Sequence, residues 1–183
     1  EDERVTYEVL LHPNNDERPN LIVVIADASN LKRNLLFCSQ IIDLKIPVVI
    51  ALTMNDIARK KGISIDTEGL ERLMQVPVVS INPRKNKGIA VLKKKIAAQY
   101  ENTHSRPQED FIDIKALTGD WLEDVKKIGG VESNYQALHF ACHATHTNHL
   151  QAAQRIQLAA LIGENHFQKA NVQANEVMQR YQR

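Results

Sequence analysis

Polar residues follow two apolar runs of this sequence, at the positions where strands of a parallel sheet would end. Pro47–Leu52 runs into Thr53–Asp56, and Val76–Ile81 runs into Asn82–Arg84. Open α/β sheets hold their ligands at the carboxyl ends of the strands. A carboxylate such as that of Asp56 can accept two parallel hydrogen bonds there, from an N–H and NH2 edge like that of guanine. The alternative is that Asp56 only caps the following helix, and the spacing alone favours neither interpretation.

A set of histidines in the second half of the chain is the other group suited to chemistry. His139, His143 and His146 are spaced i, i+4 and i+7, which places them on one face of a helix. Two histidines four residues apart can share a metal ion, and a site made of histidines alone suits Zn²⁺, Ni²⁺ or Cu²⁺. The alternative is a solvated or interdomain helix face rich in histidine, which is the more common meaning of so short a pattern.

Three similar units must position the polar strand ends. Each contains a continuous apolar run that ends in a polar residue, at Leu21–Asp27, Pro47–Asp56 and Val76–Asn82. Such short runs are typical of strands buried on both faces of a parallel sheet. Helical patterns follow the runs, from a cap at Ser29 or Asn30 to Leu44, from Asp56 to Gly62, from a cap at Asp66 or Thr67 to Met74, and from Ile89 to Tyr100. The alternation predicts right-handed parallel crossovers and an α/β fold.

The composition changes after the polar linker Glu101–Glu109. Beyond it no strand pattern appears, and helices are predicted at Ile112–Leu117, Trp121–Ile128, Asn134–His149, Gln151–Ile162 and Gln168–Tyr181. A stretch of this length suits a small helical domain. The predicted fold is therefore α/β followed by all-α, with residues 1–105 forming the first domain and residues 106–183 the second.

The composition excludes several classes of protein. The formal net charge is +1, whereas a nucleic-acid-binding domain carries a strongly basic face. The two cysteines, Cys38 and Cys142, offer no disulfide framework, which favours a reducing compartment. No segment approaches the roughly 18 uninterrupted apolar residues of a membrane helix. The sequence starts at Glu1 without methionine, and we expect it to be part of a longer protein.

The sequence resembles the FeoB-type family of ferrous iron transport proteins. The resemblance covers essentially the whole chain, is strongest before Tyr100, and is carried by Glu1–Val5, Val23–Leu35 (VVIADASNLKRNL), Ile46–Asp56 (IPVVIALTMND), Lys60–Asp66 (KKGISID) and Val76–Ile89 (VPVVSINPRKNKGI). It implies that the chain contains the carboxyl-terminal part of a GTPase G domain. The fold would then be a partial P-loop-GTPase-like parallel sheet, of which three strands are seen in this sequence. The helical remainder resembles the dissociation-inhibitor-like domain that follows the G domain in this family.

The resemblance implies a role for six residues at the strand ends. Thr53-Met54-Asn55-Asp56 occupies the base-recognition motif usually written NKxD, so Asp56 would read the guanine edge, while Thr53 and Met54 stand where Asn and Lys are usual. Asn82-Pro83-Arg84 occupies the second base-contacting loop, where Ser-Ala-Arg or Ser-Ala-Lys is common. Because Pro83 has no backbone N–H for the base oxygen, we expect weak discrimination between GTP and ATP.

The phosphate-binding part of such a pocket has no counterpart in the sequence. No G-x-x-x-x-G-K-S/T occurs in it, although that loop holds the phosphates and the Mg²⁺ ion in P-loop proteins. We therefore expect an amino-terminal half with the P-loop and both switches to be missing, and these 183 residues alone neither to bind nor to hydrolyse GTP. The strand Leu21–Ala26 would then have an unprotected apolar edge, which favours self-association.

Two functional hypotheses remain open at this point. The first is the cytoplasmic GTP-binding regulatory region of a bacterial ferrous iron transporter, at the cytoplasmic side of the inner membrane. GTP or GDP and Mg²⁺ would bind the intact protein, a GTPase, and the membrane-spanning part of the same polypeptide would be the partner. The second is a stand-alone module that binds a transition metal through His139, His143 and His146. A metabolic α/β enzyme is disfavoured because no catalytic constellation is visible.

Overall fold

The chain folds into two compact units, each described by itself below. The computed structural model describes residues 9–11, 18–102, 109–111, 113–118, 120–142 and 150–163. One unit spans Pro19–Glu109, and the other combines the residues before Pro19 with those from Asp110 onward.

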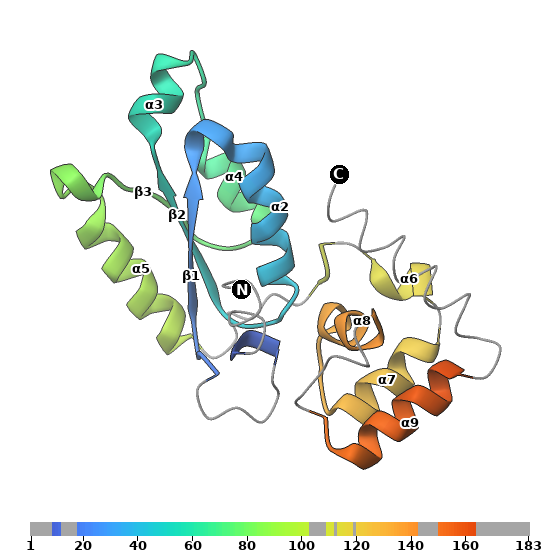
Figure 1. Cartoon of the computed structure of the whole chain (residues 1–183). Helices are drawn as coiled ribbons and strands as arrows, with labels where there is room; N and C mark the ends of the chain where they lie inside the picture. Colours follow the sequence, from blue (N-terminus) through green and yellow to red (C-terminus); the bar gives the residue numbers. More distant parts are fainter. Residues whose placement is uncertain are drawn as a thin grey trace. The chain divides into compact units, whose positions relative to one another are not determined.

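The first unit is built on a parallel sheet of three strands. β1 (Ile22–Asp27), β2 (Val48–Thr53) and β3 (Val78–Ser80) lie in the order β1-β2-β3 (Figure 1). The register pairs Ile22 with Val48 at one end of β1 and Asp27 with Thr53 at the other. The predicted α/β fold with three parallel strands is confirmed. β3 is shorter than its apolar run, and it begins just after Pro77, which has no N–H for the sheet.

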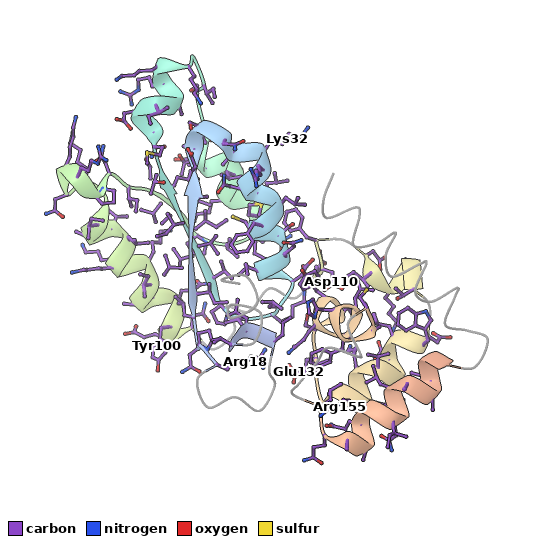
Figure 2. All side chains as sticks on the ribbon, in the orientation of Figure 1. Arg18, Lys32, Tyr100, Asp110, Glu132 and Arg155 are labelled. Carbon is purple, nitrogen blue, oxygen red and sulfur yellow. The ribbon has the colours of Figure 1, made fainter. Side chains whose placement is uncertain are left out.

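Helices cover both faces of this sheet. α2 (Leu31–Ile42) and α4 (Thr67–Met74) lie on one face, and α5 (Ile89–Glu101) lies on the other (Figure 1). Side chains fill the space between the sheet and these helices (Figure 2). Because β2 is the middle strand between two layers, its residues Val48–Leu52 are fully buried, which explains why they are all apolar. The core under α5 consists of Leu21, Val23, Val49, Ala51, Val79, Ile81, Ile89, Leu92 and Ile96.

Short helical turns connect the strands to these longer helices. They are η1 (Ala28–Asn30) after β1, α3 (Asn55–Lys60) after β2 and η2 (Pro83–Lys85) after β3. The prediction that Asp66 caps α4 is confirmed, since its carboxylate accepts the N–H of Gly69 at 2.9 Å. The predicted cap position of α2 is confirmed at Asn30, directly before Leu31, but no side-chain capping bond forms there. Asp27 instead accepts the N–H of Ser29 at 2.7 Å.

The second unit is helical throughout the part that the structure describes. It contains α6 (Ile114–Thr118), α7 (Trp121–Gly129), α8 (Asn134–Cys142) and α9 (Ala152–Gly163), with α7 in contact with the other three. Its core includes the fully buried Leu122, Leu138, Phe140 and Leu158. The predicted helix Gln168–Tyr181 and residues 143–149 of the predicted helix Asn134–His149 lie outside the described residues.

A short segment from the start of the chain belongs to this helical unit. Leu10 and Leu11 are buried, and the side-chain amide of Gln136 donates a hydrogen bond to the carbonyl oxygen of Leu11. The predicted division into domains at residue 105 stays a prediction. Among the described residues, no helix is both long enough and apolar enough to cross a bilayer.

Candidate functional site

The carboxyl end of the central strand is tied to both of its neighbours by polar side chains. The hydroxyl of Thr53 donates a hydrogen bond to the carbonyl oxygen of Ala26 on β1 at 3.3 Å. On the other side, the Nδ2 atom of Asn55 donates to the carbonyl oxygens of Leu52 at 2.8 Å and of Ile81 at 3.5 Å. Polar side chains at and just after the end of β2 therefore connect the carboxyl ends of all three strands.

Between these two ties, Met54 turns the chain sharply out of the sheet. Its backbone is left-handed, with φ 56° and ψ 25°, a conformation that costs a residue with a side chain of the order of 1 kcal/mol or more. The turn ends β2 and starts α3 within one residue. It leaves the side chain of Met54 47% exposed at the edge of the sheet.

Asp56 follows in the first turn of α3 and is exposed. The cap position of this helix belongs to Met54, and within the described residues the Asp56 carboxylate has no hydrogen-bond or ion-pair partner. The alternative that Asp56 only caps a helix is therefore wrong. Its carboxylate is available to accept hydrogen bonds from a ligand.

The loop after β3 is folded around Asn82. The Asn82 side chain accepts the N–H of Lys85 at 3.2 Å, and its backbone N–H donates to the carbonyl of Lys87 at 2.9 Å. The N–H of Asn86 donates to the carbonyl of Pro83 at 3.1 Å. Pro83 has no N–H, and the backbone N–H of Arg84 has no acceptor among the described residues.

The two loops are neighbours because their strands are paired. The N–H of Ile81, one residue before Asn82, donates to the carbonyl of Leu52 at 2.8 Å. The structure thus brings the six sequence-predicted residues, Thr53, Met54, Asp56, Asn82, Pro83 and Arg84, to one edge of the sheet. The edge offers a free carboxylate, a free backbone N–H and an exposed apolar side chain, which are the groups needed to bind one edge and one face of a purine.

Sequence reasoning did not single out two residues of this edge. Asn55 makes the bonds to Leu52 and Ile81, and Asp27 holds the turn at the end of β1. The one feature of the sequence that could have drawn attention to Asn55 is its amide side chain, just after the end of a buried strand. Its partners became visible only when β3 was placed beside β2.

The predicted histidine site has no further support. His139 lies in α8, whereas His143 and His146 lie outside the described residues. Across the ranges that the structure describes, no three His, Cys, Asp or Glu side chains come together to hold a metal.

Burial raises the pKa values of the Cys38 and Cys142 thiols to about 11, so both are protonated at neutral pH.

Comparison with known proteins identifies the family. A family model described as ferrous iron transport protein B matches residues 1–96, more than half of the 183-residue chain. The chain belongs to the ferrous iron transport protein B family.

Two curated relatives illustrate how much of the family's length is present. The Fe(2+) transporter FeoB of Leptospira biflexa is 38% identical over 93 residues, covering 51% of this chain and 13% of the relative. The Fe(2+) transporter FeoB of Legionella pneumophila is 47% identical over 75 residues, covering 41% of this chain and 10% of the relative. The chain thus spans a small part of the length of these transporters.

Solved structures of the family share the fold. The cytosolic domain of L. pneumophila FeoB is 26% identical, with a TM-score of 0.63, and the match covers 95% of this chain and 72% of that chain. The cytosolic domain of the T. maritima FeoB iron transporter in a GMPPNP form is 20% identical, with a TM-score of 0.62, covering 98% and 72%. Both matches extend over the α/β unit and the helical unit of the present chain.

Proposed function

We propose that this chain forms the base-binding half of a guanine-nucleotide pocket in the cytoplasmic regulatory region of a bacterial ferrous iron transporter. The observation that supports this most directly is the unpartnered, exposed Asp56 carboxylate at the carboxyl edge of the described part of the sheet. Its neighbour Asn55 is hydrogen-bonded to Ile81, the residue before the Asn82 loop. Family membership and the GMPPNP form of the T. maritima neighbour support the choice of nucleotide.

In this proposal each free group at the edge makes one contact with the guanine base. The Asp56 carboxylate accepts the N1–H and 2-amino hydrogens of guanine, bonds that are stronger than neutral ones because the acceptor is charged. The free N–H of Arg84 donates to the base oxygen in place of the N–H that Pro83 lacks. The exposed Met54 side chain covers one face of the ring.

The phosphates and the Mg²⁺ ion would be held by residues outside this sequence, which contains no P-loop motif. The intact protein would then be the GTPase. Its nucleotide state would reach the membrane-spanning part of the same polypeptide through the helical unit, at the cytoplasmic side of the inner membrane. Such a relay requires that nucleotide binds two states of the protein with different affinity.

A reconstitution experiment tests the proposal. We expect this chain alone to show no measurable binding of a fluorescent GDP analogue, and to bind it once the P-loop half of the G domain is supplied. In the reconstituted protein, Asp56→Ala should lower the GDP affinity ten- to hundredfold, the loss expected for hydrogen bonds to a charged acceptor.

The matched control is Glu68→Ala. Glu68 occupies the same second position of its helix, α4, as Asp56 does in α3, and it is also exposed. It should leave GDP affinity unchanged. Equal affinities for wild type and Asp56→Ala would overturn the assignment of Asp56. Micromolar binding by the isolated chain would overturn the claim that the phosphate-binding half is required.

A further inference from the structure

We propose that Asn55 is the positioning residue that sets the distance between the two base-contacting loops. The inference rests on the proposed function and concerns a residue that occupies the variable position of the base-recognition motif. It starts from the two hydrogen bonds of the Asn55 side chain, to Leu52 and to Ile81.

These side-chain bonds extend the hydrogen-bond ladder between β2 and β3 beyond the point where the backbone turns away. In the ladder between β2 and β3, the N–H of Ile50 donates to the carbonyl of Pro77 at 2.8 Å, and the carbonyl of Leu52 accepts the N–H of Ile81 at 2.8 Å. The next bond of a parallel ladder would run from the N–H of residue 54 to the carbonyl of Ile81. Met54 is left-handed, so the chain turns away, and the side-chain amide of Asn55 donates to that carbonyl instead.

The amide is well suited to this place. Its nitrogen carries two hydrogens, which serve the carbonyls of Leu52 and Ile81 at the same time. The Leu52 carbonyl, with two lone pairs, accepts both from Asn55 and from the N–H of Ile81. One side chain therefore joins the carboxyl ends of both strands.

The position of these bonds links them to the nucleotide site. Asp56 is the residue after Asn55, and Asn82 is the residue after Ile81. Three further hydrogen-bonded pairs of the Asn82 loop lie within the loop itself, namely Asn82 with Lys85, Asn82 with Lys87, and Pro83 with Asn86. The loop is therefore a compact piece whose connection to the Asp56 turn depends on the Ile81–Leu52 bond and on Asn55.

The first test compares two nucleotides that differ by one Asp56 contact. GDP carries the 2-amino group of guanine, and inosine diphosphate (IDP) lacks it but keeps the N1–H and the base oxygen. In the protein reconstituted with its P-loop half, we expect wild type to prefer GDP over IDP by about tenfold, the effect of one hydrogen bond to a charged group. Asn55→Ala should bring this ratio close to one, because displacement of Asp56 removes its bond to the 2-amino group. IDP affinity should fall by about tenfold at most, the loss of the remaining bond to the N1–H.

A purely structural role would lower the affinities for GDP and IDP together and leave their ratio unchanged, which would overturn the proposal. The matched control is Asn34→Ala, which removes a comparable amide bond, from Nδ2 of Asn34 to the carbonyl of Asn30 at 2.9 Å in α2. It should leave the ratio at the wild-type value.

The second test needs no nucleotide and uses the 183-residue chain as it is. In Asn55→Ala, amide hydrogen exchange at Ile81 and Asn82 should become at least about tenfold faster, because local opening governs exchange at such sites. Exchange at Ile22, whose N–H donates to the carbonyl of Pro47 on the other side of β2 at 2.8 Å, should not change. Unchanged exchange at Ile81 and Asn82 would overturn the positioning role.

The two tests separate this inference from the proposed function. If the reconstituted wild type bound neither nucleotide, the proposed function would fail, while the exchange rates would still decide whether Asn55 holds the loops together. If wild type bound GDP and Asn55→Ala kept the full preference for it over IDP, the positioning role alone would fail.

Discussion

At the residue scale, base recognition in the proposed pocket would depend on which donors the Asn82 loop leaves free. Pro83 has no N–H, and the N–H groups of Lys85 and Asn86 are used inside the loop. Within the described residues the N–H of Arg84 has no acceptor, and in the proposed pocket it would donate to the base oxygen. Guanine offers an acceptor at this position and adenine a donor, so each N–H aimed at it adds preference for guanine.

We expect Pro83→Ala to raise the ratio of GTP to ATP affinity in the reconstituted protein. The new N–H at position 83 adds a second donor for the guanine oxygen, and one neutral hydrogen bond corresponds to a factor of about three to ten. Titration with both nucleotides measures the ratio. A wild type that already excludes ATP as strictly as the variant does would contradict the expected weak discrimination.

Gly88 is the residue where the loop after β3 meets α5, and its backbone allows no side chain. Its φ is +79°, and a Cβ atom there would lie 2.3 Å from the carbonyl oxygen of Ser80 and 3.1 Å from the Cα of Ile81. Both contacts are with backbone, which cannot move aside without shifting β3.

We expect Gly88→Ala to lower the free energy of unfolding by about 3 kcal/mol, from the left-handed backbone and the steric contact together. Gly62→Ala is the matched control, since Gly62 has φ +73° and a Cβ atom added to it would have no described atom within 4 Å. It should cost about 1 kcal/mol. Chemical denaturation measures the free energy of unfolding of both variants. Equal decreases would contradict the expectation, because the contact with Ser80 would then add nothing to the effect of the left-handed backbone.

At the scale of the elements, β1 differs most from the other strands. It ends the β1-β2-β3 order, so within the described residues no strand pairs with its outer edge. Its side chains alternate between the two faces, and Ile25, on the face covered by α5 elsewhere, is 68% exposed. A strand with a free edge and an exposed branched apolar residue is a site for association with another strand.

We expect the isolated chain to self-associate through β1, and Ile25→Lys to shift it toward monomer. Lysine on an edge strand opposes pairing because an added strand would cover part of the sheet face on which its charge lies. Sedimentation equilibrium at one protein concentration measures the change. Ile156→Lys is the control, because Ile156 in α9 is 70% exposed but lies in the helical unit. A monomeric wild type, or an equal effect of both variants, would refute the role of β1.

At the scale of the whole molecule, each of the two units has its own buried residues, and only one of them carries the candidate site. All six residues of the candidate site lie in the unit that spans Pro19–Glu109. The helical unit has its own buried residues, among them Tyr135, Leu138 and Phe140. The family match ends at residue 96, within α5, whereas the structural match with L. pneumophila FeoB reaches 95% of the chain. The helical unit is therefore related to the family by fold where the sequence signal has faded.

Much of this architecture could be derived from the sequence. Continuous apolar runs such as Val48–Leu52 predict strands buried on both faces, and the helical periods between them predict the crossovers, because both signals come from residues close together in the chain. The same runs end at Asp56 and Asn82, so the edge that carries the candidate site followed from the order of the elements alone. The resemblance of the sequence to ferrous iron transport proteins was visible in local motifs.

Only the tertiary structure decided how that edge is held together. The left-handed turn at Met54, the two bonds of Asn55 and the free N–H of Arg84 depend on how β3 lies against β2. Asn30 likewise occupies the predicted cap position of α2 without a side-chain capping bond, while Asp27 holds the η1 turn before it. The bond from Asn55 to Ile81 joins residues 26 positions apart. The residues around Asn55 do not reveal that partner, because it depends on how the whole of β3 pairs with β2.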